Sequence, residues 1–133
     1  MTGLVLKLRP RERLLVNGVV VENGERRARL NILTPDARVL RLRDAIHPEQ
    51  AKTPVARVCY IAQLVLAGEA DPADGKQQLL KGIEQLSQVF RDSDSRARLA
   101  EATDHTSGEN YYPALKALRA LLPREKRLME TTP

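Results

Sequence analysis

Hydrophobic and polar residues alternate along the first 43 residues of the chain and recur with a helical period over most of the remainder. The first alternating run is the clearest, because every second residue from Leu4 to Leu8 is leucine, up to Pro10, which has no N–H to donate to a sheet. Runs bounded by turn residues predict five short strands, at residues 4–8, 13–16, 19–22, 28–33 and 38–43. Their close succession indicates a small antiparallel sheet.

Two Asn-Gly pairs, Asn17-Gly18 and Asn23-Gly24, lie on either side of the third strand. Asn and Gly tolerate the positive φ angles of type I′ turns, so each pair predicts a tight reversal. Thr34-Pro35-Asp36 is a third turn signal before the last strand. The strands are therefore expected to form a meander, with Arg26 and Arg27 at the mouth of the second hairpin.

From residue 53 onward, apolar residues recur at the spacing of helices. Thr53-Pro54 and Asp71-Pro72 each join a capping side chain to a proline at the first helical position. The Ser93-Asp94-Ser95 cluster predicts the start of a third helix, and the apolar stripe after Tyr111 predicts a fourth. The charged residues from Pro123 onward are expected to form a frayed tail.

These patterns predict an α+β fold, with an antiparallel β-module of about five short strands followed by a bundle of about four helices. The expected parts are a basic β-module at residues 1–47, a helical bundle at residues 53–125 and a flexible tail at residues 126–133. No internal repeat and no low-complexity segment divides the chain further.

Charge separates the same two halves. The net charge is +5, and residues 1–52 carry 11 Lys and Arg against 6 Asp and Glu, whereas the remaining residues are balanced. Nine of those 11 cations are arginine, whose planar fork matches phosphate and guanine edges. The N-terminal half is therefore expected to meet an anionic partner, with nucleic acid favoured over a lipid surface, and a merely solvated face is the alternative.

Arginines recur along the last predicted strand. Val39, Arg41 and Arg43 are expected on one face and Leu40 and Leu42 on the other, so that one face is packed and one is basic. Binding to phosphates and simple solvation both remain open for the arginine pair.

The four aromatic residues, Tyr60, Phe90, Tyr111 and Tyr112, all lie in the helical half. The basic strands thus offer no ring on which a base could stack, which excludes recognition by a stacking sheet. Recognition through arginine side chains and backbone groups at strand edges is still possible. This mode is suited to an RNA loop whose bases are already splayed out. Tyr111 and Tyr112, with Leu115 and Leu118, are expected either to pack the helices or to face a partner protein.

The sequence contains few residues that could take part in catalysis. His47 precedes a proline, His105 has only chain neighbours as partners, and Cys59 lies in an apolar run where a buried, inert thiol is expected. These residues do not make a structural zinc site, and no phosphate-binding glycine loop is present in the sequence. We expect no enzyme, cofactor, metal or small-molecule substrate. The sequence has no transmembrane run and no secretory signal, so a cytoplasmic location is expected.

The first third of the chain resembles the small RNA-binding CsrA domain. The shared features are Pro10-Arg11-Glu12, Asn17-Gly18, Thr34-Pro35 and the run from Arg38 to Asp44, in the same order. In that family the first and last strands lie side by side across a swapped dimer and hold a GGA-bearing RNA loop. The resemblance implies RNA contacts by Arg43, with Leu6 and Lys7 on the first strand. Arg11 stands where that family has glycine.

Over nearly its whole length, the chain resembles the flagellar regulator family FlbT. The similar segments are LKLRPRERLLVNGVVVENGERRARLNIL, VLRLRDAIHPEQAKTPVARVCYIAQL and GENYYPALKALRALLP. The resemblance implies an alphaproteobacterial regulator that acts on flagellin synthesis after transcription, at the 5′ leader of flagellin mRNA and alongside the small protein FlaF. The family includes repressors and activators, and repression is the favoured expectation.

The sequence therefore predicts a post-transcriptional regulator that is not an enzyme. Its expected RNA-binding residues are Leu6, Lys7, Arg26, Arg27, Arg29, Arg41 and Arg43, and its expected partner-binding residues are Tyr111, Tyr112, Leu115 and Leu118. The expected partners are the flagellin mRNA leader and FlaF, a homodimer is left open, and no membrane contact is expected. The alternative is an adaptor that binds FlaF or flagellin through its helices and affects mRNA only indirectly.

Overall fold

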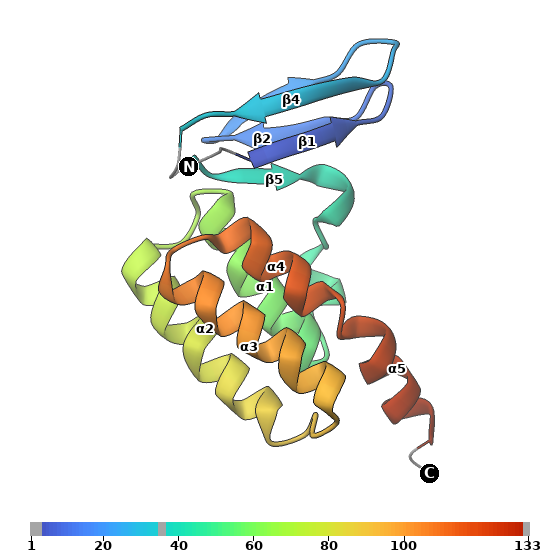
Figure 1. Cartoon of the computed structure of the whole chain (residues 1–133), viewed down its shortest axis with the longest axis vertical. Coiled ribbons are helices and arrows are strands. Elements are labelled where there is room, and N and C mark those ends of the chain that lie inside the picture. The colour runs from blue at the N-terminus through green and yellow to red at the C-terminus, as the bar shows by residue number, and fades with distance from the viewer. Residues whose placement is uncertain (1–3, 35–36, 132–133) are drawn as a thin grey trace.

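The computed structural model describes residues 4–34 and 37–131. A β-module lies at one end of the molecule and packs on a bundle of helices (Figure 1). Its strands are β1 (Leu4–Leu8), β2 (Arg13–Val16), β3 (Val19–Glu22), β4 (Ala28–Ile32) and β5 (Val39–Arg41). The predicted α+β fold, with a short-stranded antiparallel module preceding the helices, is confirmed.

The strands form two sheets and not one meander. β1 pairs with β4 in a two-stranded ribbon, and β2 is the centre of a three-stranded sheet in the order β3-β2-β5. All of these pairings are antiparallel and lie within one chain. The first and last strands therefore belong to different sheets.

The two Asn-Gly pairs behave differently. Asn17 and Gly18 have φ angles of 50° and 83°, which confirms the predicted tight turn between β2 and β3. Neither Asn23 nor Gly24 has a positive φ, so the second predicted hairpin turn is wrong. Their backbones continue the β2–β3 ladder through Glu12 and Arg11, and the chain then crosses to the other sheet. The third predicted turn falls on Pro35-Asp36, outside the described residues.

The turn at residues 10–12 has a glycine-like backbone without glycine. Arg11 has a φ of 62°, in the left-handed region that L side chains rarely adopt. This is the position at which the CsrA pattern has glycine. Glycine adopts this conformation without strain, so the backbone here is one that suits the glycine of that pattern, although an arginine adopts it in this chain.

β5 is shorter than predicted. It ends at Arg41, and a 3₁₀ turn, η1 (Leu42–Asp44), follows it. A second 3₁₀ turn, η2 (Pro48–Gln50), leads into the bundle. All three β5 residues are buried, so the prediction of one packed and one basic face for this strand is corrected.

The helices are α1 (Pro54–Leu66), α2 (Pro72–Ser87), α3 (Ser93–Ser107), α4 (Tyr111–Arg119) and α5 (Leu122–Thr131). Thr53, Asp71 and Asp92 cap the first three by accepting a backbone N–H. The sequence predicted a charged tail after Pro123, but the structure has α5 there. Glu125 of α5 is buried and accepts the N–H of Val55 in the first turn of α1, which anchors the extra helix.

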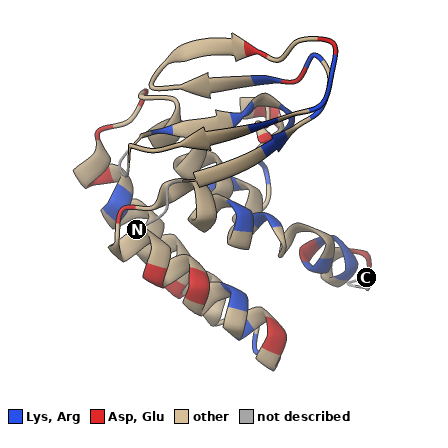
Figure 2. Cartoon of the chain, turned by 45° about the horizontal axis from the view of Figure 1, so that its top comes forward, with Lys and Arg blue, Asp and Glu red and all other residues tan. Residues whose placement is uncertain are grey.

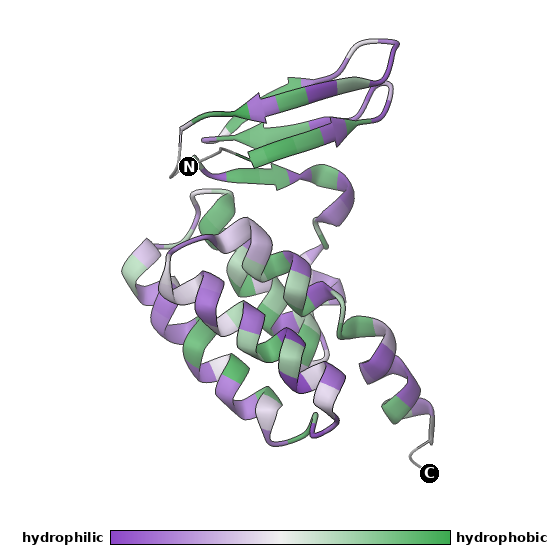
Figure 3. Cartoon of the chain, viewed as in Figure 1, coloured by the Kyte–Doolittle hydropathy of each residue, from purple (hydrophilic) through white to green (hydrophobic). Residues whose placement is uncertain are grey.

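One hydrophobic core runs through both parts of the molecule. It joins Leu6, Leu8 and Leu14 of the sheets to the apolar faces of the helices, and Figure 3 shows hydrophobic residues in both the strands and the helices. Cys59 belongs to this core, where burial raises the pKa of its thiol to about 12, so the expectation of a buried cysteine is confirmed.

Candidate functional site

The β1–β4 ribbon presents cations on its outer face. Leu6 and Leu8 point inward and are buried, so the alternating Lys7 points outward and is exposed. The strand register places Arg29 directly opposite Lys7, and Arg29 is exposed as well. Like charges opposite one another destabilise a sheet, so this pair is a place where a bound anion would be favourable.

Three more arginines extend this surface at the end of the ribbon where β1 finishes and β4 begins. Arg9, Arg26 and Arg27 are exposed there, and Figure 2 shows Lys and Arg gathered along the loop that enters β4. The Asn23 side-chain amide donates to the carbonyls of Arg9 and Arg26, at 2.7 and 2.9 Å. Asn23 thus ties the two arginine-bearing segments together.

We name this surface the basic ribbon. Its residues are Lys7, Arg9, Arg26, Arg27 and Arg29. Within the described part of the chain, none of these five side chains makes an ion pair. Their charges therefore remain available to an anionic ligand.

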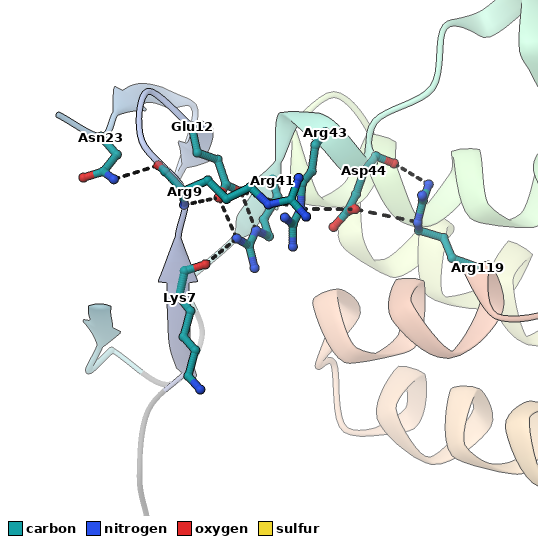
Figure 4. Close-up of polar contacts among 8 residues, drawn as sticks. All are labelled: Lys7, Arg9, Glu12, Asn23, Arg41, Arg43, Asp44 and Arg119. Atoms are coloured by element: carbon teal, nitrogen blue, oxygen red, sulfur yellow. Dashed lines mark hydrogen bonds and ion pairs between the residues drawn. The ribbon is translucent and has the colours of Figure 1, made fainter. Parts of the chain in front are cut away.

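Arg41 does not belong to the basic ribbon, and its guanidinium is already hydrogen-bonded within the chain. Its guanidinium donates from Nε and Nη2 to the two carboxylate oxygens of Glu12, at 2.6 and 2.7 Å, and from Nη2 to the carbonyl of Lys7 at 2.7 Å (Figure 4). Glu12 also accepts the backbone N–H of Arg9 at 3.0 Å. This fork joins β1, the turn before β2, and β5.

The environment of this pair favours both charges. The hydrogen bonds from Arg41 lower the pKa of Glu12 to about 2, against the opposing effect of burial. Glu12 in turn raises the pKa of Arg41. Arg41 is only 6% exposed, which corrects the prediction of a solvent-facing arginine on β5. Its replacement would disturb the fold as well as any RNA contact.

Arg43 lies between the β-module and the helices. Its Nε is 3.7 Å from Glu12 and 4.0 Å from Asp44, and the side chain is partly exposed. Asp44 is held in turn by Arg119 of α4, which donates to the Asp44 carbonyl at 2.8 Å (Figure 4). Because Arg43 follows β5 in a 3₁₀ turn, it does not continue a strand face with Arg41.

The sequence-predicted RNA residues therefore separate into three groups. Lys7, Arg26, Arg27 and Arg29 come together on the basic ribbon, Arg41 and Arg43 lie around Glu12, and Leu6 is buried in the core. Sequence reasoning missed Arg9, which the alternation through Lys7 could have identified as outward-facing. It also missed Asn23, whose bonds to the segments that follow β1 and precede β4 have no sequence signal.

The predicted partner-binding residues lie in the core. Tyr111, Tyr112, Leu115 and Leu118 are all buried, so the alternative that they pack the helices is confirmed, and their assignment to a partner surface is corrected. They lie on the inward face of α4, and Tyr112 lies beside Arg41. Burial raises the pKa of the Tyr112 hydroxyl.

The helical part has a different apolar surface, a groove between α2 and α3. It has a volume of about 440 Å³. Its lining residues are Leu80, Ile83, Glu84, Ser87, Arg96, Leu99, Ala100 and Thr103. A mixed apolar and polar lining of this kind is suited to a protein segment.

Two further features bear on the choice of ligand. In residues 4–34 and 37–131, no helix is both long and apolar enough to cross a bilayer. The same residues contain no group of three His, Cys, Asp or Glu side chains placed to hold a metal ion.

The fold and the basic ribbon define a small α+β protein with a surface suited to an anionic partner. The model of the flagellar protein FlbT matches residues 4–129, and the chain belongs to the FlbT family. The predicted family is thereby confirmed. No solved structure matches the chain.

Several relatives are similar to the chain over most of their length. The flagellum biosynthesis repressor protein FlbT of Caulobacter vibrioides (strain ATCC 19089 / CIP 103742 / CB 15) is 29% identical over 122 residues, which cover 92% of this chain and 86% of the relative. A relative named as a probable flagellum biosynthesis repressor protein FlbT, from Allorhizobium ampelinum, is 32% identical over 130 residues, covering 95% and 83%. A protein of the same name from Mesorhizobium japonicum is 27% identical over 126 residues, covering 95% and 84%.

Proposed function

We propose that this chain is a repressor in flagellum biosynthesis that acts after transcription, by binding the 5′ leader of flagellin mRNA through the basic ribbon. The printed names of the relatives support the flagellar and repressor parts of this proposal. The observation that carries the RNA part is the cluster of five exposed cations without intrachain ion pairs. In this proposal the protein works in the cytoplasm together with FlaF.

The mode of binding follows from the side chains present. Arginine and lysine on a two-stranded ribbon can neutralise successive phosphates, and arginine forks can also reach base edges. No aromatic side chain lies on β1 or β4, so bases would not be held by stacking. Binding is therefore expected to be dominated by phosphate contacts and to weaken strongly with salt.

The test is a titration of the purified chain against the flagellin mRNA leader and a scrambled RNA, at two salt concentrations, with and without FlaF. The key variant is Lys7→Ala/Arg29→Ala, because both residues are exposed and neither carries an intrachain ion pair in the described structure. Each lost phosphate contact should lower the slope of log K against log salt by roughly 0.7 for single-stranded RNA.

The control variant is Lys81→Ala/Arg91→Ala, which removes two exposed cations from the neutral helical half. It should bind as the original chain does. An unchanged slope in Lys7→Ala/Arg29→Ala would remove the basic ribbon from the RNA site. Equal binding to the scrambled RNA would remove the specificity for the leader.

The second candidate function is an adaptor that binds FlaF and influences mRNA only through it. The groove between α2 and α3 favours this candidate, since it is a partly apolar hollow on the described helices, whereas the predicted partner residues of α4 are buried. Ala100→Arg would fill the groove from an exposed position, while Ala97→Arg adds the same side chain to α3 outside it. Loss of FlaF pull-down in Ala100→Arg alone, with no RNA binding by the isolated chain, would favour the adaptor.

A further inference from the structure

The strand β3 is an exposed apolar edge. Val19, Val20 and Val21 are 62%, 60% and 36% exposed, and Glu22 completes a strand with no buried residue. β3 pairs with β2 on one side, and none of the other described strands pairs with its second side. Natural proteins usually protect such edges with lysine, proline, a bulge or a covering segment. Among the residues of β3, only Glu22 at its end is charged.

The hairpin geometry determines which backbone groups the edge offers. Val16 and Val19 flank the two-residue turn and are register partners, so they exchange both hydrogen bonds. Alternation then directs the N–H and C=O groups of Val19 and Val21 toward β2. The groups of Val20 point to the open edge, as do those of Glu22. The open edge can therefore form a further antiparallel ladder centred on Val20.

The sequence of β3 is suited to pairing with itself. In an antiparallel pair centred on Val20, Val20 faces its own copy and Val19 faces Val21 of the second chain. Glu22 then faces Gly18, so no charge lies opposite a like charge. β-Branched side chains on both faces favour such pairing.

Charge identifies this edge as the one most compatible with a second copy. The chain carries a net charge of +5, and five cations of the β-module that make no ion pair in the described structure lie together on the basic ribbon. A second chain approaching β1 or β4 would meet Lys7 and Arg29 as like charges. Near β3, in contrast, Arg13 and Arg11 are already paired with Glu22, at 2.9 and 3.7 Å.

We propose that β3 pairs antiparallel with β3 of a second copy, forming one continuous sheet in the order β5-β2-β3-β3-β2-β5. A four-residue strand buries less surface than a typical permanent interface, so the association is weak and reversible. The dimer places two basic ribbons in one complex. Its formation does not depend on RNA.

The first measurement is sedimentation of the full chain over a range of concentrations reaching several hundred micromolar, a range suited to a weak interface. The original chain should shift from monomer to dimer. Val20→Lys should shift this transition to at least about tenfold higher concentration, because two lysines would face each other across the two-fold axis. Val5→Lys is the matched control, since Val5 is 51% exposed on the outer face of β1. It should leave the association unchanged.

A second variant separates strand pairing from a loose apolar contact. Val20→Pro removes only an N–H that points to the open edge, and proline is tolerated at such positions of an edge strand. It should abolish the dimer while circular dichroism shows an unchanged fold. A chain that stays monomeric throughout, or a dimer that survives Val20→Lys, would overturn the proposal. Loss of the dimer in Val20→Lys but not in Val20→Pro would also overturn the pairing, because side-chain contact alone would then hold the two copies together.

Discussion

At the scale of single residues, the Glu12 carboxylate has a strongly lowered pKa. Its pKa is lowered to about 2 by Arg41, so the folded protein holds the charged form more tightly than the unfolded chain does. The stabilisation is complete above the ordinary glutamate pKa near 4.5 and is lost as the pH falls toward 2. A shift of this size corresponds to about 3 kcal/mol.

We therefore predict that the free energy of unfolding falls by about 3 kcal/mol more in the original chain than in Glu12→Gln when the pH is lowered from about 5 to about 2. Urea unfolding at several pH values in this window measures the difference. At neutral pH, Glu12→Gln should itself be strongly destabilised, because it leaves Arg41 buried without a counter-charge. Parallel pH profiles for the two proteins would show that Glu12 is not the carboxylate responsible.

A second residue-scale prediction concerns Arg11, whose φ of 62° is strained for an L residue. Arg11→Gly should be more stable than Arg11→Ala by about 1 kcal/mol, because both lose the guanidinium and only alanine keeps the Cβ. The ion pairs of Arg11 with Glu22 and Glu25 are exposed and contribute little. Thermal unfolding of the two variants makes the comparison. Equal stabilities would mean that the turn relaxes to another conformation.

Local sequence patterns predicted the position of some of these charged side chains and not of others. The alternation of Lys7 between buried leucines was enough to place it outside, because a strand fixes its side chains by local geometry. The same alternation predicted that Arg41 faces solvent, and this prediction was wrong. Its partner Glu12 lies 29 residues earlier in the chain, so no local pattern reveals the contact. The basic ribbon was thus partly predictable, while the fork around Glu12 was not.

At the scale of elements, α2 packs against α1 through its glycines. A Cβ at Gly82 would lie 2.8 Å from Cγ2 of Val58, and one at Gly75 would overlap Cγ2 of Val65. Valine is held in a single rotamer in a helix, so it cannot turn aside. The glycines therefore set the close approach of the two helices.

Gly82→Ala should consequently destabilise the protein by roughly 1–2 kcal/mol, even though alanine favours a helix by about 1 kcal/mol over glycine. Chemical denaturation measures the loss. Gln85→Ala on the same helix is the control and should have little effect, because Gln85 is exposed. The double variant Gly82→Ala/Val58→Ala should recover part of the loss. A more stable Gly82→Ala would show that the helices separate easily.

Element boundaries were predictable where a local signal marks them. Thr53 and Asp71 begin their helices as expected, since a cap and a following proline act within one turn. The fifth helix had no such signal. It depends on Glu125 reaching the first turn of α1, 70 residues earlier in the chain. The tight turn predicted at the second Asn-Gly pair was wrong for a related reason. The Asn23 side chain instead donates to the backbone carbonyls of Arg9 and Arg26, and the Arg9 carbonyl lies 14 residues earlier in the chain.

At the scale of the whole molecule, the β-module and the helical bundle are joined by more than the linker between them. The hydrophobic core is continuous from Leu14 of β2 to Leu118 of α4. Gln63 of α1 bonds both backbone groups of Ile46, and Arg119 of α4 bonds the Asp44 carbonyl. Shared burial of this kind makes it costly for either part to unfold alone.

We therefore predict one cooperative unfolding transition. Cys59 reports on the bundle, because its thiol is buried with a pKa of about 12 and should react with a thiol reagent only after unfolding. Amide hydrogen exchange of β2 and β5 reports on the β-module. Both signals should change at the same denaturant concentration. Arg119→Ala should lower this common midpoint, whereas Arg57→Ala on the exposed face of α1 should not. If β2 and β5 lose protection well before Cys59 becomes reactive, the β-module opens independently, and the buried fork around Glu12 stabilises the module without coupling it to the helices.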